Sequence, residues 1–276
     1  MASFNTTTTT TNTNEIDHQI KISSTSSVKE EKNLEEEVKV EMSEMEKSKV
    51  GIMRALVQKQ DPSNCKEVND DLMIRRFLRA RDMDVEKASQ MFLKYLSWRH
   101  SFMPPNGGCF TNSDVATDIA HNKVFMQGHD KQGRPLLLVY GGRHKQHNPD
   151  HLKRFVVYCL EKLCTRMPKG HEMFVAIGDL KGWGYANCDI RGYLAGLSIL
   201  QDCYPERLGK LFLVNVPYIF MTAWKMVYPF IDKNTKKKIV FVDNKKLKPT
   251  LLNDIHEEQL PEIYGGKLSL VPIQDC

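Results

Sequence analysis

Few residues of this 276-residue chain have the types and spacing that catalysis requires. Asp179 and Lys181 could act as an acid and a base, but no nucleophile can be placed beside them. Gly182 and Gly184 are not followed by the third glycine and the helix of a dinucleotide site. The histidines between residues 121 and 147 lie in predicted loops, at spacings that fit no metal motif. The sequence therefore predicts neither an enzyme nor a bound cofactor or metal.

A strongly apolar segment followed by a basic run is the more distinctive signal. One apolar stripe at helical spacing consists of Phe220, Trp224, Val227 and Ile231, and other faces carry Met221, Met226, Tyr228 and Phe230. A helix that is apolar on all sides is either buried or faces something other than water. The run KNTKKK at residues 233–238 follows directly. Core packing and lipid contact both remain possible for the helix, as do a solvated surface and a lipid contact for the lysines.

The segments around this helix predict strands that would position it. Short apolar runs at 211–216 and 239–243 indicate two parallel strands joined by the helix in a right-handed crossover. Further strands are predicted at 124–127, 136–140 and 174–178, and further helices after Asn148 and Pro149, at 190–202 and near 253–260. This alternation predicts an α/β fold with a largely parallel sheet, in which ligands bind beyond the carboxyl ends of the strands. Those ends are Asp179 with Leu180, Asn215 with Pro217, and Asp243.

Three regions are predicted along the chain. Residues 1–45, with a threonine run and then many Glu and Lys, form a disordered, acidic tail. Residues 46–105 form a helical subdomain in which Asp84 caps a helix, and 114–276 form the α/β domain. The window 211–230 is apolar enough to suggest a membrane span, but it divides into a strand and a helix around Pro217, so we reject a span.

Composition and charge favour a globular protein of the cytoplasm. Hydrophobic residues make up 41% and charged residues 26%, which suits a sizeable core. The net charge of +5 is too small and too local to indicate a nucleic-acid partner. The 7 cysteines follow no paired spacing, which fits a reducing compartment.

Several motifs, in one order, resemble the CRAL-TRIO lipid-binding family. In its N-terminal helical part the match comprises Phe77 to Arg81, Asp84, Val85, Trp98 and Arg99. Farther along, the matching motifs are Gly133 to Pro135, Asp179 to Gly182, Tyr204 to Arg207, Asn215 to Pro217, Thr235 with Lys238, and Leu260 to Gly266. The resemblance covers about residues 50–270, and within the family it is greatest to phosphatidylinositol transfer proteins of the secretory-pathway type. It implies a helical subdomain, then a mostly parallel sheet with helices that enclose an apolar lipid cavity closed by a gating helix.

The resemblance also implies the residues of a site. Arg81, Glu206, Thr235 and Lys238 would bind the inositol phosphate head group, and the gate would consist of Phe220, Trp224, Val227, Tyr228, Phe230 and Ile231. Arg and Lys suit a phosphodiester, whereas a carboxylate and a hydroxyl suit an inositol ring. The sequence departs from the family at Asp82, where many members have a basic residue. It also has no polar side chain where some members bind choline, at Met126, Leu137, Cys159, Phe174 and Ala176, which favours another hydrophobic lipid as second ligand.

The predicted function is phosphatidylinositol binding and its transfer between membranes or presentation at a membrane. A two-chain lipid with about 30 methylenes, at ~0.8 kcal/mol each, would lose roughly 25 kcal/mol on escape into water, so the protein must touch the bilayer. Lysines near the surface would add about 1 kcal/mol each. We expect a monomer, cytoplasmic and transiently peripheral to membranes, with a lipid kinase as a further candidate partner. The alternatives are a carrier of a sterol, retinoid or tocopherol-like molecule on the same fold, and a non-transfer adaptor.

Overall fold

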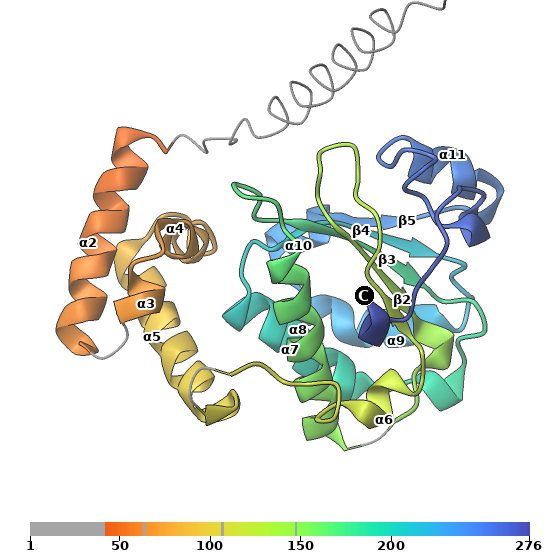
Figure 1. The fold of residues 1–276 in the computed structure, drawn as a ribbon, viewed down its shortest axis with the longest axis horizontal. Helices are drawn as coiled ribbons and strands as arrows, with labels where there is room; N and C mark the ends of the chain where they lie inside the picture. The colour runs from red at the N-terminus through yellow and green to blue at the C-terminus, as the bar shows by residue number, and fades with distance from the viewer. Residues whose placement is uncertain (1–41, 63–64, 106–107, 147) are drawn as a thin grey trace, which may run out of the picture. The chain divides into compact units, whose positions relative to one another are not determined.

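A five-stranded sheet and a set of helices form the part of the chain that the structure describes. This computed structural model describes residues 42–62, 65–105, 108–146 and 148–276 (Figure 1). Apart from residues 42–45, the predicted tail lies outside these ranges. Of those four residues, Glu44 and Met45 belong to the first described helix.

Among the described residues before 105, the predicted helical subdomain consists of four helices. They are α2 (Glu44–Gln60), α3 (Cys65–Val68), α4 (Asp71–Arg79) and α5 (Val85–Phe102). The predicted cap at Asp84 is confirmed, because its carboxylate accepts a hydrogen bond from the Lys87 backbone N–H at 3.1 Å. The rings of Phe77 and Phe92, both buried, meet edge to face at 4.8 Å and join α4 to α5.

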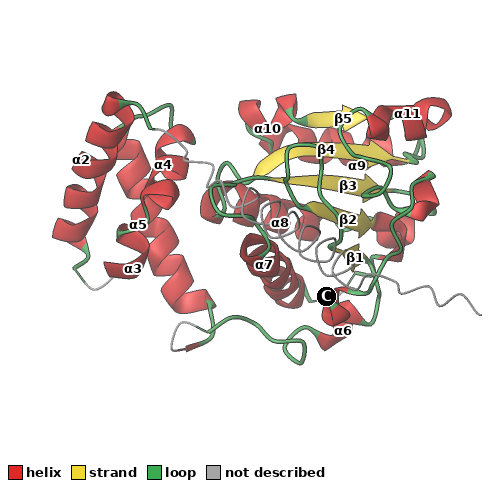
Figure 2. Ribbon diagram, turned by 45° about the horizontal axis from the view of Figure 1, so that its top comes forward, coloured by secondary structure: helices red, strands yellow, loops and turns green. Residues whose placement is uncertain are grey.

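The sheet is mostly parallel, as predicted, and its strands lie side by side in chain order (Figure 2). They are β1 (Val124–Phe125), β2 (Leu136–Tyr140), β3 (Phe174–Asp179), β4 (Leu208–Val214) and β5 (Ile239–Phe241). β1 is antiparallel to β2, and the other neighbouring pairs are parallel. β4 ends earlier than predicted, because Asn215 adopts a left-handed backbone with φ 52° that a strand cannot contain.

Helices between the strands supply the crossovers. They are α7 (Pro149–Thr165), α8 (Ile190–Cys203), α9 (Phe220–Val227) and α10 (Lys233–Lys237), and the short α6 (Ala116–Ile119) precedes β1. The predicted start of α7 is confirmed, since the Asn148 side chain caps it and Pro149 is its first residue. Short 3₁₀ turns cover Gly141–Arg143, Tyr185–Asn187, Tyr228–Phe230, Asn244–Lys246, Glu262–Tyr264 and Ile273–Asp275.

The two faces of the sheet are covered by different elements. One face packs Val175, Ile177 and Phe212 against residues of the C-terminal segment, including Leu251 and Ile255. The alternate residues of the same strands point to the other face, toward α7, α8 and α9. Successive crossovers that step in the same direction across a parallel sheet place their helices on one face, which explains this division.

Two predicted helices differ from the structure. The last helix is α11 (Leu247–Leu252), whereas residues 253–260, predicted to be helical, form turns that bring Ile255 and Leu260 onto the sheet. The apolar segment at 220–231 is not one helix either: α9 ends at Val227 and a 3₁₀ turn follows. Pro229 explains this end, because it has no N–H to donate and its ring would clash with the preceding turn.

The apolar window at 211–230 divides into β4 and α9, as predicted. Among the described residues, no helix has the length and apolar character needed to cross a membrane.

Candidate functional site

An apolar cavity of about 430 Å³ lies between the sheet and three helices. The sheet contributes Leu137, Val139, Phe174, Ala176, Gly178, Leu208, Leu211 and Leu213. The helices α7, α8 and α9 contribute Leu152, Phe155, Val156, Cys159, Leu160, Gly192, Tyr193, Gly196, Leu197, Leu200, Phe220, Ala223, Trp224 and Val227. Nearly all of these side chains are apolar, so the cavity suits the hydrocarbon part of a ligand. Burial among them raises the pKa of the Cys159 thiol, which keeps that group neutral.

The residues predicted to form the gate do not all line the cavity. Phe220, Trp224 and Val227 line the cavity from α9. Tyr228 and Phe230 lie outside it and are 45% and 60% exposed. Ile231 is buried, but it does not line the cavity and adopts extended backbone after the 3₁₀ turn. One helix therefore covers the cavity, and the aromatic turn after it faces solvent.

The exposed aromatics belong to a surface that is both apolar and basic. Trp224 contacts the ring of Tyr228 at 5.6 Å and the ring of Phe241 in β5 at 5.1 Å. The Lys236 ammonium lies 4.4 Å from the centre of the Tyr228 ring. We call Tyr228, Phe230, Lys236 and Phe241 the gate surface. Its composition resembles that of interfacial segments, in which aromatic groups enter the lipid boundary and lysines attract anionic lipids.

Three of the four predicted head-group residues lie close together at the amino ends of β4 and β5. The Lys238 ammonium donates a hydrogen bond to Glu206 Oε2 at 3.2 Å, and both side chains are partly exposed. Thr235 lies one turn before Lys238, whose backbone N–H donates to the Thr235 carbonyl at 3.0 Å. Glu206 adopts a left-handed backbone with φ 58°, a conformation that costs a non-glycine residue energy and is often found at functional sites.

The Asp232 carboxylate fixes the helix that carries Thr235. It caps α10 by accepting backbone hydrogen bonds from Asn234 and Thr235, each at 2.8 Å. Burial by itself would raise the pKa of Asp232, but these hydrogen bonds and the charge of Lys238 together hold it below the ordinary value. The carboxylate is therefore ionised near neutral pH, and it orients the turn that bears Thr235 and Lys238.

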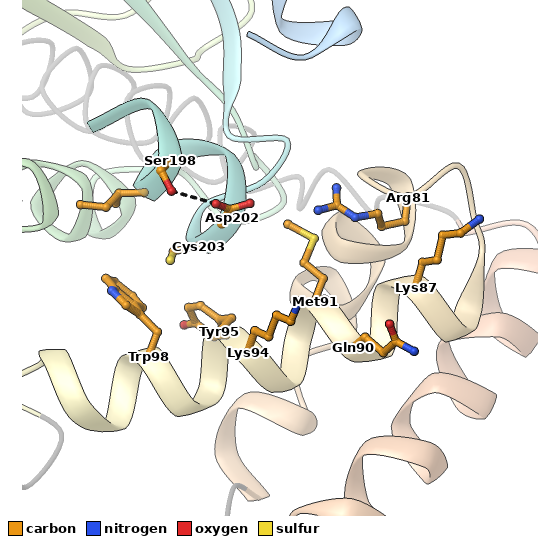
Figure 3. A pocket seen from close by; sticks show the side chains of 11 residues that line it. Arg81, Lys87, Gln90, Met91, Lys94, Tyr95, Trp98, Ser198, Asp202 and Cys203 are labelled. Carbon is orange, nitrogen blue, oxygen red and sulfur yellow. Dashed lines mark hydrogen bonds between the residues drawn. The ribbon is translucent and has the colours of Figure 1, made fainter. Parts of the chain in front are cut away.

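Arg81 lies in a different pocket. This pocket, of about 470 Å³, is bounded by α5 and α8, and its lining includes Lys94, Tyr95 and Asp202 but none of the other three predicted head-group residues. Figure 3 shows the Arg81 guanidinium directed toward the side on which Asp202 lies. Arg81 also donates to the Ala80 carbonyl at 2.8 Å. The structure thus brings Glu206, Thr235 and Lys238 together and leaves Arg81 apart from them.

Sequence reasoning missed a buried ionic cluster at the other end of the cavity. Lys123 and His144 line the cavity, and the Lys123 ammonium contacts Asp118 Oδ1 at 2.6 Å and His144 Nδ1 at 3.3 Å. His144 Nε2 lies 3.2 Å from Asp189 Oδ2. In these four residues, the Lys123 cluster, Asp118 and Lys123 are near each other in the chain, whereas His144 and Asp189 come from two other segments, so no local motif joins all four.

Asp179, one of the predicted strand-end positions, is part of the buried framework. Its carboxylate accepts hydrogen bonds from Asn215 Nδ2 at 2.9 Å, from the Tyr264 hydroxyl at 2.8 Å and from the Lys181 backbone N–H at 2.9 Å. Asp179 is 2% exposed, so these bonds satisfy a buried charge and join two strand ends to the C-terminal segment. Within the ranges that the structure describes, no group of three His, Cys, Asp or Glu side chains could hold a metal ion.

Most of the positions at which some members of the family bind choline line the cavity in this protein. Leu137, Cys159, Phe174 and Ala176 line it, whereas Met126 is buried elsewhere in the core. This wall therefore has no hydroxyl from those positions, and the preference for another hydrophobic lipid as second ligand stays a prediction.

Two family models match the chain. A CRAL/TRIO domain matches residues 119–266, and a CRAL/TRIO, N-terminal domain matches residues 36–94. The domain limits predicted at 46–105 and 114–276 stay predictions.

Three curated relatives show the extent of the similarity. The chain is 31% identical to the Sec14 cytosolic factor of Schizosaccharomyces pombe, over 71% of this chain and 74% of that protein. It is 30% identical to the phosphatidylinositol transfer protein PDR17 of Saccharomyces cerevisiae, over 70% of this chain and 56% of that protein. It is also 30% identical to Patellin-5 of Arabidopsis thaliana, over 88% of this chain but only 39% of that protein. The chain thus spans less than two thirds of the length of the last two relatives.

A solved structure shares the fold. The crystal structure of Sfh5 superimposes with a TM-score of 0.60 at 18% identity, covering 76% of this chain and 84% of that one.

Proposed function

The chain belongs to the CRAL-TRIO family and is Sec14-like, and from this premise we propose that it carries phosphatidylinositol between membranes or presents it at a membrane. Lipid binding and transfer are the properties that its similarity to the Sec14 cytosolic factor and to PDR17 supports. The choice of phosphatidylinositol is the proposal, and the similarity to PDR17, a phosphatidylinositol transfer protein, is one reason for it.

One observation carries the proposal: an apolar cavity whose covering helix leads directly into an exposed aromatic and basic turn. Trp224 on α9 lines the cavity and also contacts Tyr228 and Phe241 of the gate surface. A helix in this position separates hydrocarbon from water while the protein is in solution. When the gate surface rests on a bilayer, the same helix separates one hydrocarbon phase from another, so moving it costs much less. This is the arrangement that lipid exchange requires.

The head group would lie at the amino ends of β4 and β5. There the Lys238 ammonium can exchange its hydrogen bond with Glu206 for one with a phosphate oxygen, because both side chains are partly exposed. The Glu206 carboxylate is then released to accept hydrogen bonds from inositol hydroxyls, and the Thr235 hydroxyl can donate or accept. Arg81, in its separate pocket, would need a movement of the helical region to join them.

The test is transfer of radiolabelled phosphatidylinositol between vesicles, together with native mass spectrometry of the loaded protein. Hydrogen bonds to charged groups contribute about 1.5–3 kcal/mol, so we expect Lys238→Ala to lower loading and transfer roughly tenfold or more. Lys237→Ala is the matched control, since it removes the adjacent lysine at the end of α10 and leaves the contact of Lys238 with Glu206 in place. If the two substitutions lower loading and transfer equally, the lysines act only through their positive charge, and Lys238 does not bind the head group specifically.

The four predicted residues can also be tested together. If the quadruple alanine variant at Arg81, Glu206, Thr235 and Lys238 still loads phosphatidylinositol as the wild type does, the head-group proposal is wrong. The gate surface is tested separately by Phe230→Ser, which should slow transfer several-fold and leave loading unchanged.

A second candidate ligand is a smaller hydrophobe. The apolar cavity volume of about 430 Å³ lies toward the low end of the roughly 300–1,000 Å³ found for sites of drug-sized ligands. Such a carrier would yield a neutral molecule on extraction, whereas an adaptor would be recovered empty.

In each case we propose a monomeric carrier or adaptor in the cytoplasm rather than an enzyme. We also propose that it contacts membranes transiently and that a lipid kinase is a candidate partner of the loaded form.

A further inference from the structure

A surface groove lies between α5 and α8, apart from the apolar cavity. Two pockets, of about 470 Å³ and about 510 Å³, share Trp98, Ser198 and Ile199, so they form one continuous hollow. None of the described residues that line it also lines the apolar cavity. We call it the α5–α8 groove, and its lining includes Lys94, Trp98, Phe102, Arg154, Ser198 and Ile199.

The floor of the groove is aromatic. Figure 3 shows Trp98 and Tyr95 directed from α5 toward α8. The Trp98 ring stacks on Phe102 with 5.3 Å between the ring centres and meets the Tyr204 ring edge to face at 6.4 Å. These contacts hold the partly exposed indole in place, so it loses little conformational freedom when a partner covers it. Tryptophans held in this way are frequent hot spots of protein interfaces.

The charged residues that line the groove are mainly cationic. Five cations and two carboxylates contribute to the lining: Arg81, Lys87, Lys94, Lys153, Arg154, Asp150 and Asp202. Lys87 pairs with Asp84 at 2.7 Å, and Lys153 pairs with Asp150 at 2.9 Å. A surplus of positive charge is still present after these pairings, and it favours an acidic partner.

Lys94 and Arg154 are the cations best placed to bind such a partner. Both are exposed, and within the described residues neither forms an ion pair, although Arg154 acts on Asp114 and Asp150 over a longer distance. Lys94 lies about one helical turn before Trp98 on α5, and Arg154 on α7 lines the same pocket as Trp98. Carboxylates beside an apolar group that covers Trp98 could therefore meet both cations.

The walls of the groove favour a helix as the occupant. They are themselves helices, whose backbone N–H and C=O groups already bond to one another, so an extended peptide would find no main-chain partners. A helix satisfies its own backbone and presents apolar side chains at i, i+3, i+4 and i+7. From Lys87 to Phe102 the groove extends about 22 Å along α5, which is the length of a helix of about 15 residues.

We propose that the α5–α8 groove binds an acidic amphipathic helix of a partner protein. The apolar face of that helix covers Trp98, and its carboxylates pair with Lys94 and Arg154. The proposal goes beyond lipid transfer and uses neither the apolar cavity nor Glu206 and Lys238. Arg81 also lines one end of the groove, so it is left unchanged in the test.

The test is isothermal titration calorimetry of the full chain with a synthetic peptide, acetyl-AEALEELLEALLEEA-amide. As a helix this peptide carries leucines on one face and glutamates on the others. We expect it to bind the wild type, and we expect Lys94→Glu/Arg154→Glu to weaken binding at least tenfold, because attraction becomes repulsion at both positions. The same peptide with lysine in place of every glutamate should not bind.

A second variant changes the shape of the groove and leaves its charges in place. Ser198→Trp adds an indole to the hollow from an exposed position on α8 and should also weaken binding at least tenfold. The control is Lys245→Glu/Lys246→Glu, which reverses two exposed cations after β5 and should leave binding unchanged. An equal loss in the control, unchanged binding in both groove variants, or no binding to the wild type would overturn the proposal.

An anionic membrane is the rival occupant of the groove. If Lys94→Glu/Arg154→Glu lowers sedimentation with phosphatidylserine vesicles while the peptide fails to bind the wild type, the groove contacts lipid and the proposal is wrong. Phosphatidylinositol loading of both groove variants should equal that of the wild type, because Glu206 and Lys238 are unchanged. Loss of peptide binding with normal loading therefore separates this proposal from the proposed function.

Discussion

On one face of the sheet, Phe212 and Ile177 are in contact with the C-terminal segment and are almost completely buried. On the other face, their neighbours Leu213 and Ala176 border a cavity of about 430 Å³. Both sets are apolar, come from the same two strands and alternate along them. The difference between a filled and a hollow face arises from what covers each one and, in β3, from side-chain size, because Ala176 and Gly178 border the cavity whereas Val175 and Ile177 face the filled side.

The covering elements explain the difference. The C-terminal segment has short helices and turns, so its apolar side chains, such as Leu251 and Leu260, can approach the sheet closely. The hollow face is covered by helices whose inward residues include Gly196 and Ala223, and these leave space that larger side chains would fill. The cavity is thus bordered by small residues on both sides, Gly196 and Ala223 on the helices and Ala176 and Gly178 on β3.

The largest predicted effect removes a ring from the filled face. Phe212→Ala should lower the free energy of unfolding by about 3–5 kcal/mol, because a fully packed ring is replaced by a void. Leu213→Ala, the next residue but on the hollow face, should cost about 2 kcal/mol, since part of its surface has no neighbouring atoms to lose. Urea unfolding of both variants measures the difference, and equal losses would contradict the contrast between the faces.

A second prediction adds volume to each face in turn. Val175→Phe overfills the filled face and should cost about 1–3 kcal/mol. Ala176→Phe points into the cavity and should change stability by less than about 1 kcal/mol, yet it should reduce ligand loading at least tenfold. The readouts are urea unfolding and native mass spectrometry. If Ala176→Phe loaded ligand normally, the cavity would not be the binding site.

A third prediction concerns pH and the filled face. Burial, together with the charge of Asp179 and the hydrogen bond to it, raises the pKa of the Tyr264 hydroxyl above the ordinary value of about 10. Since the pKa is higher in the folded state, this group stabilises the protein fully below pH ~10, and its contribution is lost as the pH rises beyond that value.

Tyr264→Phe should cost about 1–2 kcal/mol at pH 7, because Asp179 loses one of its hydrogen-bond donors. Urea unfolding at pH 8 and pH 11 should show the gap between wild type and variant narrowing at the higher pH. A gap that widens would mean that the sign of the shift is wrong.

The smallest predicted change in stability is on the hollow face, at the covering helix. Val227→Ala removes two methyl groups from the part of α9 that lines the cavity and should cost less than about 1 kcal/mol. Release of the fluorescent hydrocarbon 1,6-diphenylhexatriene from the cavity, followed by stopped-flow fluorescence, should nevertheless become several-fold faster. Unchanged release would indicate that ligands leave by another route.

The amino-acid sequence by itself determined the order and type of most elements. Capping signals such as Asp84 and the pair Asn148 and Pro149 placed helix starts, because a cap acts within one turn of chain. Apolar runs bounded by turn residues placed the strands, and their alternation with helices gave the largely parallel sheet. The errors came where apolar periodicity continued past a local break, as at Pro229, and where a helix was assigned to turns at 253–260.

Only the tertiary structure decided which face of the sheet is hollow and which charged groups meet. Strands of a parallel sheet are apolar on both sides, so the run at 174–179 does not by itself reveal that its smaller residues, Ala176 and Gly178, border a cavity. The contact of Glu206 with Lys238, the separation of Arg81 from both, and the pairing of Lys123 with His144 join segments far apart in the chain. Such contacts depend on how the crossovers bring strand ends together. No local pattern of residues encodes which distant side chains then lie within contact distance.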